Sequence, residues 1–252
     1  MDPFHIQPII DLNSGEVCGG EVLWRPGGHP PSCEHLQALE DDPVVSLRVA
    51  QQSLAFALAI LDRLQSNLWL SVNISARYLG SGRSFFRPIS EAFPDLDLVR
   101  RRVGRRLVIE VTERCIAGDR ETSFINQLSN FHAIAIDDFG IGDVPLSHML
   151  SLHFDKVKAD RELVTGVDFD PYRQRFLQWL VAGCRAIGVK VCAEGVETQS
   201  EQAYLRRIGV DEGQGWLWSK AIEASAFECL AASGRPELDR PGQGIGLLES
   251  SC

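Results

Sequence analysis

The chain has 252 residues, of which 44% are hydrophobic and 23% are charged, which suits one enzyme-sized domain with a large buried core. Its formal net charge of −9 argues against the general basic surface by which proteins bind long nucleic acids. A small phosphate ligand stays compatible with this charge, because bound divalent metal ions can invert the sign of an acidic site.

Short runs of apolar and β-branched residues recur along the chain and predict buried strands. Eight candidates lie at about 5–10, 17–24, 68–74, 106–111, 133–137, 154–158, 189–193 and 209–217. Segments with helical periodicity lie between them, and 44–64 and 173–187 are the clearest. This alternation, over this length, predicts an α/β fold with a TIM-like (β/α)8 barrel.

The first connection differs from the others. Only the turn-rich residues 11–16 separate the first two strands, which is too short a link for a crossover helix. We therefore expect an N-terminal hairpin that gives the barrel one antiparallel strand. The remaining strands can run parallel, so that their C-terminal ends share one mouth, where such barrels place their chemistry.

The two ends of the chain and its cysteines indicate the extent of the domain and the cellular compartment. Residues 1–232 are predicted to form one domain, and the Gly- and Pro-rich residues 233–252 a loose C-terminal extension. No basic segment followed by an apolar stretch opens the chain, and no run reaches about 18 uninterrupted apolar residues. The seven cysteines are odd in number and lack Cys-x-x-Cys spacing, which argues against a disulfide framework. We expect a cytoplasmic protein that does not enter the membrane.

Acidic side chains sit at the downstream ends of the predicted strands. Glu21, Glu110, Asp137, Asp138 and Glu194 all occupy such positions. A carboxylate placed where a buried strand surfaces is poorly explained by folding alone. If the strand ends converge at one mouth, these carboxylates converge as well.

The donor set predicts the kind of metal. Together with Asn73, these carboxylates offer only oxygen ligands, which Mg²⁺ or Mn²⁺ prefers over zinc. The adjacent Asp137 and Asp138 are the sharpest feature, because one could bridge two ions while its neighbour binds the second. Two ions about 3.5–4 Å apart stabilise the attacking and leaving oxygens in phosphoester hydrolysis.

Each of these positions also has a purely structural interpretation. Asp138 could begin a turn or cap a helix, Asn73 could end its strand in an Asx turn, and Glu110 could pair with an arginine in 101–106. Separate structural explanations of this kind would have to hold at all five strand ends, so the metal-site interpretation is favoured.

The motifs and their order resemble an EAL-domain cyclic-di-GMP phosphodiesterase over about residues 6–222. The motifs are Gln7-Pro8-Ile9, Gly20-Glu21-Val22-Leu23-Trp24-Arg25, Val72-Asn73-Ile74-Ser75, Glu110-Val111-Thr112-Glu113, Asp137-Asp138-Phe139-Gly140, Lys158-Ala159-Asp160, Ala193-Glu194-Gly195-Val196-Glu197 and Gln214-Gly215-Trp216. The resemblance implies a TIM-like barrel with one antiparallel strand, hydrolysis of cyclic-di-GMP to linear pGpG, two ions of Mg²⁺ or Mn²⁺, and a homodimer.

The resemblance also implies roles for individual residues. The first ion would be held by Glu21, Asn73, Glu110 and Asp137, and the second by Asp137, Asp138 and Glu194. Lys158 matches the lysine that contacts the nucleophilic water, and Glu194 matches a residue that could act as the general base as well as a metal ligand. Matching positions line the dinucleotide pocket at Gln7, Leu23, Arg25, Asp160 and Gln214, and support the loop and the metal ligands at Glu113 and Glu197.

One loop departs from the family pattern. After Asp138 the chain reads Phe139-Gly140-Ile141-Gly142-Asp143-Val144-Pro145, in which Ile141 and Val144 replace hydroxyl side chains and Pro145 stiffens the backbone. This loop favours an alternative function, a weak or inactive module that senses cyclic-di-GMP or docks on a regulatory protein. Because every expected ligand is present, the active phosphodiesterase is the favoured interpretation.

Overall fold

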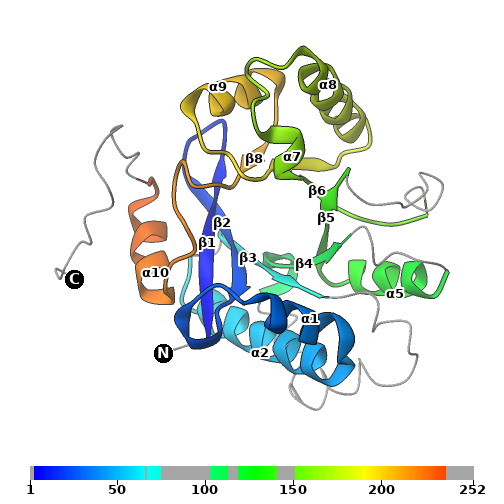
Figure 1. Cartoon of the computed structure of the whole chain (residues 1–252), viewed down its shortest axis with the longest axis vertical. Helices are drawn as coiled ribbons and strands as arrows, with labels where there is room; N and C mark the ends of the chain where they lie inside the picture. The colour runs from blue at the N-terminus through cyan, green and yellow to red at the C-terminus, as the bar shows by residue number, and fades with distance from the viewer. Residues whose placement is uncertain (1–2, 66, 75–102, 113–118, 141–150, 237–252) are drawn as a thin grey trace.

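The computed structural model describes residues 3–65, 67–74, 103–112, 119–140 and 151–236, and Figure 1 shows them as a barrel of strands surrounded by helices. The strands close into one barrel in chain order. They are β1 Phe4–Asp11, β2 Val17–Trp24, β3 Trp69–Asn73, β4 Leu107–Thr112, β5 Ala133–Phe139, β6 Lys156–Ala159, β7 Lys190–Ala193 and β8 Glu212–Gly213. The predicted eight-stranded, TIM-like barrel is confirmed.

The antiparallel strand of the barrel is β1. It pairs antiparallel with both β2 and β8, whereas every pair from β2 to β8 is parallel. The turn before β2 forms because the Asp11 carboxylate accepts hydrogen bonds from the backbone N–H groups of Asn13 and Ser14, each at 2.9 Å. Gly15 follows with a φ of 75°, which a side chain would disfavour. The predicted hairpin is therefore confirmed.

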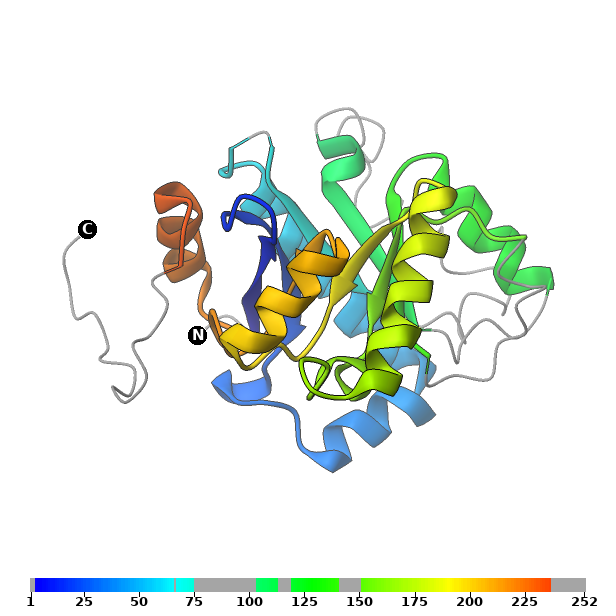
Figure 2. The same cartoon turned by 90° about the horizontal axis from the view of Figure 1, so that it is seen from above.

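The helices lie outside the barrel (Figure 2). They are α1 Cys33–Asp41, α2 Pro43–Leu61, α5 Asp119–Ser129, α7 Arg161–Val164, α8 Pro171–Ala186, α9 Gln199–Ile208 and α10 Ala224–Ser233. The predicted helices 44–64 and 173–187 correspond to α2 and α8. Both helices begin with a proline after an aspartate, Asp42 or Asp170, whose carboxylate accepts hydrogen bonds from the first backbone N–H groups.

The last strand is shorter than predicted. The sequence indicates a strand over 209–217, but only Glu212 and Gly213 pair as β8. Gly209 instead ends α9 in the left-handed conformation, with a φ of 85°. Beyond the strand, Gly215 packs so closely on the backbone of Val196 that a Cβ atom there would lie 2.0 Å from the Val196 carbonyl oxygen. The chain leaves the sheet at this contact, which apolar periodicity alone does not reveal.

Two separate sets of apolar contacts stabilise the barrel. The main core joins the outer faces of the strands to the helices and includes Ile109, Ile134 and Val157, each no more than 2% exposed. A second, small cluster consists of Val108, Ala133 and Ala135, with Trp69 packed against it. Because side chains alternate along a strand, this second set belongs to the barrel interior. Its small side chains leave interior space for polar groups nearer the mouth.

Helix α2 carries the most apolar sequence of the described helices. Val44–Leu61 is long and apolar enough to span a membrane by length and composition, with a mean hydropathy of 1.6 and 39% of its residues buried. The core helix of a soluble protein meets the same criterion, and α2 packs against β2, β3 and α1. Its apolar residues therefore have a structural explanation in the core.

Helix α10 packs beside the hairpin (Figure 1). Its Phe227 is fully buried against Gly20, where an added Cβ atom would lie 2.8 Å from the ring. Beyond the helix, the Gly234 carbonyl accepts a hydrogen bond of 2.8 Å from the Val17 N–H. The expected extension 233–252 lies mostly outside the described residues, so the proposed boundary at 232 stays a prediction.

Candidate active site

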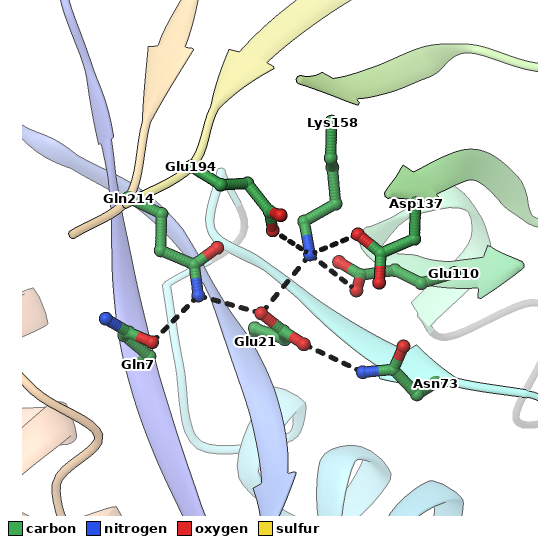
Figure 3. A network of polar contacts seen from close by, with 8 residues as sticks. All are labelled: Gln7, Glu21, Asn73, Glu110, Asp137, Lys158, Glu194 and Gln214. Atoms are coloured by element: carbon green, nitrogen blue, oxygen red, sulfur yellow. Dashed lines mark hydrogen bonds and ion pairs between the residues drawn. The ribbon is translucent and has the colours of Figure 1, made fainter. Parts of the chain in front are cut away.

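The polar residues predicted from the strand ends converge inside the mouth of the barrel (Figure 3). They come from almost every strand: Gln7 from β1, Glu21 from β2, Asn73 from β3, Glu110 from β4, Asp137 from β5 and Lys158 from β6, with Glu194 directly after β7 and Gln214 directly after β8. The parallel register places Asn73 opposite Glu110, which sets neighbouring side chains at one level. Contacts between strands that are not neighbours then cross the barrel interior.

Lys158 is the centre of this arrangement. Its Nζ lies 2.7 Å from a Glu194 oxygen, 2.8 Å from Glu110, 3.0 Å from Asp137 and 3.3 Å from Glu21. Lys158 is 2% exposed and Glu110 only 1%. One buried ammonium group therefore faces four carboxylates, three of which are at least nine-tenths buried as residues. Burial of so much uncompensated negative charge is costly in a protein interior.

The Glu21 carboxylate is held by two amide side chains as well. Asn73 Nδ2 donates to its Oε1 at 2.7 Å, and Gln214 Nε2 donates to its Oε2 at 2.7 Å. Gln7 accepts a hydrogen bond of 3.1 Å from the same Gln214 nitrogen, and donates to the Ser219 carbonyl. These contacts fix the position of Glu21 before any ligand binds.

The electrostatic effects follow from burial and proximity. Burial opposes ionisation of Glu21, but Lys158 and the hydrogen bonds from Gln214 and Asn73 hold its pKa below the usual value. Burial raises the pKa of Glu110 well above its usual range, and the nearby Glu21 charge adds to the rise. Burial would lower the pKa of Lys158, but its carboxylate neighbours, led by Asp137 and Glu110, hold it well above the usual value. Lys158 is therefore a fixed cation at neutral pH.

Glu194 differs from its neighbours in its exposure, because 19% of its side chain reaches solvent. Burial raises its pKa to about 8, with Lys158 opposing the rise and Asp137 adding to it. In the absence of another cation, this carboxyl group holds its proton near neutral pH. A divalent ion at its oxygens would release that proton.

The residues fit a divalent metal ion. One oxygen each from Asp137, Asp138 and Glu194 lies within 4.8 Å of the others. The buried Oδ1 of Asp137 lies 3.0 Å from Lys158 Nζ, yet it accepts no aligned hydrogen bond from the described residues. An excess of carboxylates, a buried oxygen without a hydrogen bond and an all-oxygen donor set are the features that Mg²⁺ or Mn²⁺ would satisfy.

A local distortion of β5 brings the adjacent aspartates together. Successive side chains of a regular strand point to opposite faces, so Asp137 and Asp138 would normally diverge. Here the pairing with β6 shifts between Ile136 and Phe139, and Asp138 has a φ of 55°. Such a backbone costs on the order of 1–3 kcal/mol and is found mainly where function requires it. The distortion explains how consecutive carboxylates can serve one site.

Comparison with known proteins identifies the family. The EAL domain family matches residues 4–221. The chain belongs to the EAL domain family. This match confirms the resemblance found in the sequence motifs.

Relatives and solved structures agree with this assignment. PdeR, a cyclic di-GMP phosphodiesterase of Escherichia coli, is 34% identical over 165 residues, which are 64% of this chain and 24% of PdeR. The PaMucR phosphodiesterase, solved as a c-di-GMP complex, aligns with a TM-score of 0.77 and 26% identity over 89% of this chain and 98% of that chain. A manganese/cy-diGMP complex of Klebsiella pneumoniae BlrP1 aligns with a TM-score of 0.73 and 26% identity over 87% of this chain and 56% of that chain. This chain spans only 24–44% of the length of three E. coli relatives.

The described contacts do not support the structural alternative considered for Glu110, a pairing with an arginine. Glu110 pairs with Lys158, whereas Arg105 pairs with Asp155 and Arg106 donates to backbone carbonyls, including that of Leu68. Asn73 donates to Glu21, and the residues that would complete an Asx turn after Asn73 lie outside the described residues. Arg101 and Arg102 lie outside the described residues.

The predicted pocket residues are only partly brought together. Gln7 and Gln214 join the Glu21 network, as described above. Leu23 is half-buried on β2 and Arg25 follows that strand; burial lowers the pKa of Arg25, and nearby Glu21 opposes the shift. Asp160 accepts a hydrogen bond of 2.6 Å from the Glu162 N–H and so begins α7. Its role toward a substrate stays a prediction.

The predicted supporting residues lie outside the central network. Glu197 lies 3.5 Å from Arg161 in a solvent-exposed ion pair. Glu113 and the loop 141–145 lie outside the described residues, so their predicted roles stay predictions.

Two groups of buried polar residues were not predicted from the sequence. Glu201 is 4% exposed, and its carboxylate accepts hydrogen bonds from the N–H groups of Gly166, Glu197 and Thr198, which holds the loop after Glu194. The Thr198-x-x-Glu201 capping box in the sequence could have indicated it. The second group surrounds Lys156, and its only sequence signal is that Lys156 and Lys158 lie two residues apart and thus share a strand face.

Proposed function

We propose that this EAL domain is a metal-dependent phosphodiesterase that hydrolyses cyclic-di-GMP to linear pGpG with two ions of Mg²⁺ or Mn²⁺. The observation that carries the proposal is the contact of one buried lysine, Lys158, with four carboxylates from different strands at the mouth of the barrel. Similarity to proteins named as cyclic di-GMP phosphodiesterases supports the choice of substrate.

The ligands divide into two overlapping sets. Glu21, Asn73, Glu110 and Asp137 would hold one ion, and Asp137, Asp138 and Glu194 the other. When bound, the ions supply a lowered pKa for a water molecule and neutralise the phosphate oxygens. The convergence of these side chains, together with the backbone distortion at Asp138, supports the assignment.

The side chains of the chain supply positioning and proton control. Because the pKa of Lys158 is high, its ammonium group would orient the attacking water and stabilise the negative charge that develops on it, rather than remove its proton. Glu194 is the carboxylate with the greatest exposure among the Lys158 partners, which suits it to accept a proton once its own has been displaced. Gln214 and Asn73 keep Glu21 in its place during the reaction.

The pocket residues would bind the dinucleotide. Arg25 offers a guanidinium group for phosphate or guanine recognition, and Gln7, Leu23, Asp160 and Gln214 complete the predicted pocket. We also propose a homodimer, as the resemblance implies, and a cytoplasmic location, and sedimentation of the purified chain tests the dimer.

Product analysis tests the proposed function. Purified protein is incubated with cyclic-di-GMP and Mg²⁺ or Mn²⁺, and the products are separated by chromatography. We expect pGpG with either ion and none with Ca²⁺, whose larger radius and looser coordination misplace the reacting oxygens. Absence of product with both Mg²⁺ and Mn²⁺ would reject the enzyme.

The altered loop favours the second candidate, a module that binds cyclic-di-GMP without hydrolysing it efficiently or docks on a regulatory protein. If Ile141 and Val144 weaken the loop, Ile141→Thr with Val144→Ser should raise the rate or lower the metal concentration required. Superimposed metal titrations at full activity would show that the loop change is neutral. Dinucleotide binding without product in wild type would favour the second candidate.

A further inference from the structure

A second polar cluster, here called the lower cluster, lies in the barrel interior beneath the site and consists of Trp69, Lys156, Lys190 and Glu212. Lys156 Nζ lies 2.6 and 2.8 Å from the two oxygens of Glu212, and both residues are at least nine-tenths buried. Lys190, whose side chain is 56% exposed, approaches Glu212 at 3.3 Å. The Lys156 ammonium group also lies 3.3 Å from the centroid of the Trp69 ring.

The backbone makes room for this cluster at Gly19. A Cβ atom at Gly19 would lie 2.4 Å from the Trp69 ring, so the absence of a side chain there lets the indole occupy the barrel interior. The ring then forms an apolar and electron-rich surface for the Lys156 ammonium group. The lower cluster is therefore a closely fitted arrangement rather than a chance surface ion pair.

The ion pair joins two strands that are not neighbours. Lys156 belongs to β6 and Glu212 to β8, and β7 lies between them. Strand β8 has only two residues, and its register consists of two residue pairs with β7 and two with β1. Backbone hydrogen bonds of Asp211 and Gln214 also tie this segment to the β7 strand and to the residue after β1, but none of those in the described residues reaches β6. A buried side-chain contact to β6 therefore adds a constraint that the sheet itself does not supply.

The residues that lie nearer the barrel mouth than Lys156 and Glu212 on the same two chain segments both contact Glu21. Lys158 lies two residues beyond Lys156 and Gln214 two residues beyond Glu212, so each pair shares a face of the chain. Lys158 Nζ approaches Glu21 Oε2 at 3.3 Å, and Gln214 Nε2 donates to the same oxygen at 2.7 Å (Figure 3). The position of β8 relative to β6 along the barrel axis thus decides whether Lys158 and Gln214 can both reach the same oxygen of Glu21.

We propose that the Lys156–Glu212 ion pair is a positioning brace, which fixes β8 against β6 so that Lys158 and Gln214 hold the Glu21 carboxylate in the geometry required for metal binding. A buried ion pair contributes little net stability compared with apolar residues of the same volume, so a role in specifying position accounts for its presence better than stability does. The brace acts through other residues and touches neither substrate nor ion. Its activity readout rests on the proposed function, whereas its metal-binding readout does not.

The test compares Lys156→Met/Glu212→Gln with a matched control. The double variant removes both buried charges, places an unbranched methionine side chain over Trp69 where the lysine chain lay, and leaves no uncompensated carboxylate beside Lys190. The control, Arg63→Met/Glu228→Gln, makes the same kind of change in an ion pair outside the barrel. There Arg63, just after α2, lies 2.7 Å from Glu228 of α10. Calorimetric titration with Mn²⁺ alone gives the affinity, and circular dichroism reports folding.

We expect the brace variant to fold and to bind Mn²⁺ at least fivefold more weakly than wild type, while the control stays within twofold. Its kcat for cyclic-di-GMP should fall at least tenfold, with KM changed by less than threefold. If the double variant does not fold, Lys156→Met alone, which leaves Glu212 paired with Lys190, provides the same comparison. Unchanged Mn²⁺ affinity in a folded variant, or an equal loss in the control, would overturn the brace. A wild type that binds Mn²⁺ but yields no pGpG would reject the proposed enzyme and leave the Mn²⁺ test of the brace intact.

Discussion

The upper and lower levels of the barrel interior use the same strand, β6, but differ in charge balance. At the upper level, Lys158 faces four carboxylates; at the lower level, Lys156 and Lys190 share one carboxylate, that of Glu212. The lower group is satisfied by its own side chains. The upper group has more carboxyl groups than its one lysine can balance if all of them ionise, and this difference, rather than the presence of acidic residues, distinguishes a candidate metal site from a structural ion pair.

Replacement of Lys158 at the upper level should have the largest effect on activity. Lys158→Ala should lower the turnover of cyclic-di-GMP by roughly 100-fold or more, because the water loses its positioned cation. Dinucleotide affinity should change far less, since the proposed contact is to water. Single-turnover kinetics and calorimetry measure the two quantities, and equal losses in both would move Lys158 to a substrate-binding role.

Removal of a metal ligand should have a comparably large effect. We expect Glu21→Ala to abolish product formation with either ion, because the variant loses a buried carboxylate from the predicted metal site. Glu16→Ala is the matched control, since this exposed glutamate belongs to the same hairpin but points away from the site. Hydrolysis at the wild-type rate by Glu21→Ala would refute the metal assignment.

Metal binding should stabilise the fold through the upper level. Saturation with Mn²⁺ at about 100 times its Kd should raise the free energy of unfolding by about 2.7 kcal/mol, which corresponds to a rise of about 5–10 °C in Tm. Asp137→Asn should remove most of this rise, because Asp137 belongs to both proposed ligand sets. Scanning calorimetry with and without Mn²⁺ measures the effect, and an equal rise in wild type and Asp137→Asn would place the ion elsewhere.

The pH dependence of the metal-free protein offers a smaller test. Glu194 has a pKa of about 8 in the folded chain against an ordinary value of 4.5, so the folded state holds a proton that the unfolded state has lost. Its contribution to stability is therefore fully present below about pH 4.5 and is lost as the pH rises to about 8. Tm should fall over this range, and Glu194→Gln should reduce the slope. An identical slope in the variant would contradict the raised pKa.

Thiol reactivity gives the smallest expected effect and tests the lower level through Cys18, whose thiol feels the charges of Glu212, Lys156 and Lys190. Burial, with Glu212 nearby, raises the pKa of Cys18 to about 12, so almost none of this thiol ionises at pH 8. Exposed Cys33 should react with iodoacetamide well before Cys18 in the folded protein. Mass spectrometry of tryptic peptides follows both residues. Equal labelling rates would show that the lower level is open to solvent.

The sequence predicted the upper level well because its signal is local. Each carboxylate follows a recognisable apolar strand, and parallel strands necessarily bring their C-terminal ends together. The lower cluster gave no comparable signal, since the pairing of Lys156 with Glu212 spans 56 residues and depends on which strands enclose the interior. Strand β8 was overestimated for a related reason: the contact of Gly215 with Val196, which ends it, is a tertiary contact.

Anomalous X-ray diffraction from crystals soaked in Mn²⁺ tests the contrast between the two levels most directly. We expect manganese peaks at the upper level, among Glu21, Asn73, Glu110, Asp137, Asp138 and Glu194, and none beside Glu212. A manganese peak at Glu212, or crystals saturated with Mn²⁺ that show no peak at the upper level, would contradict this expectation.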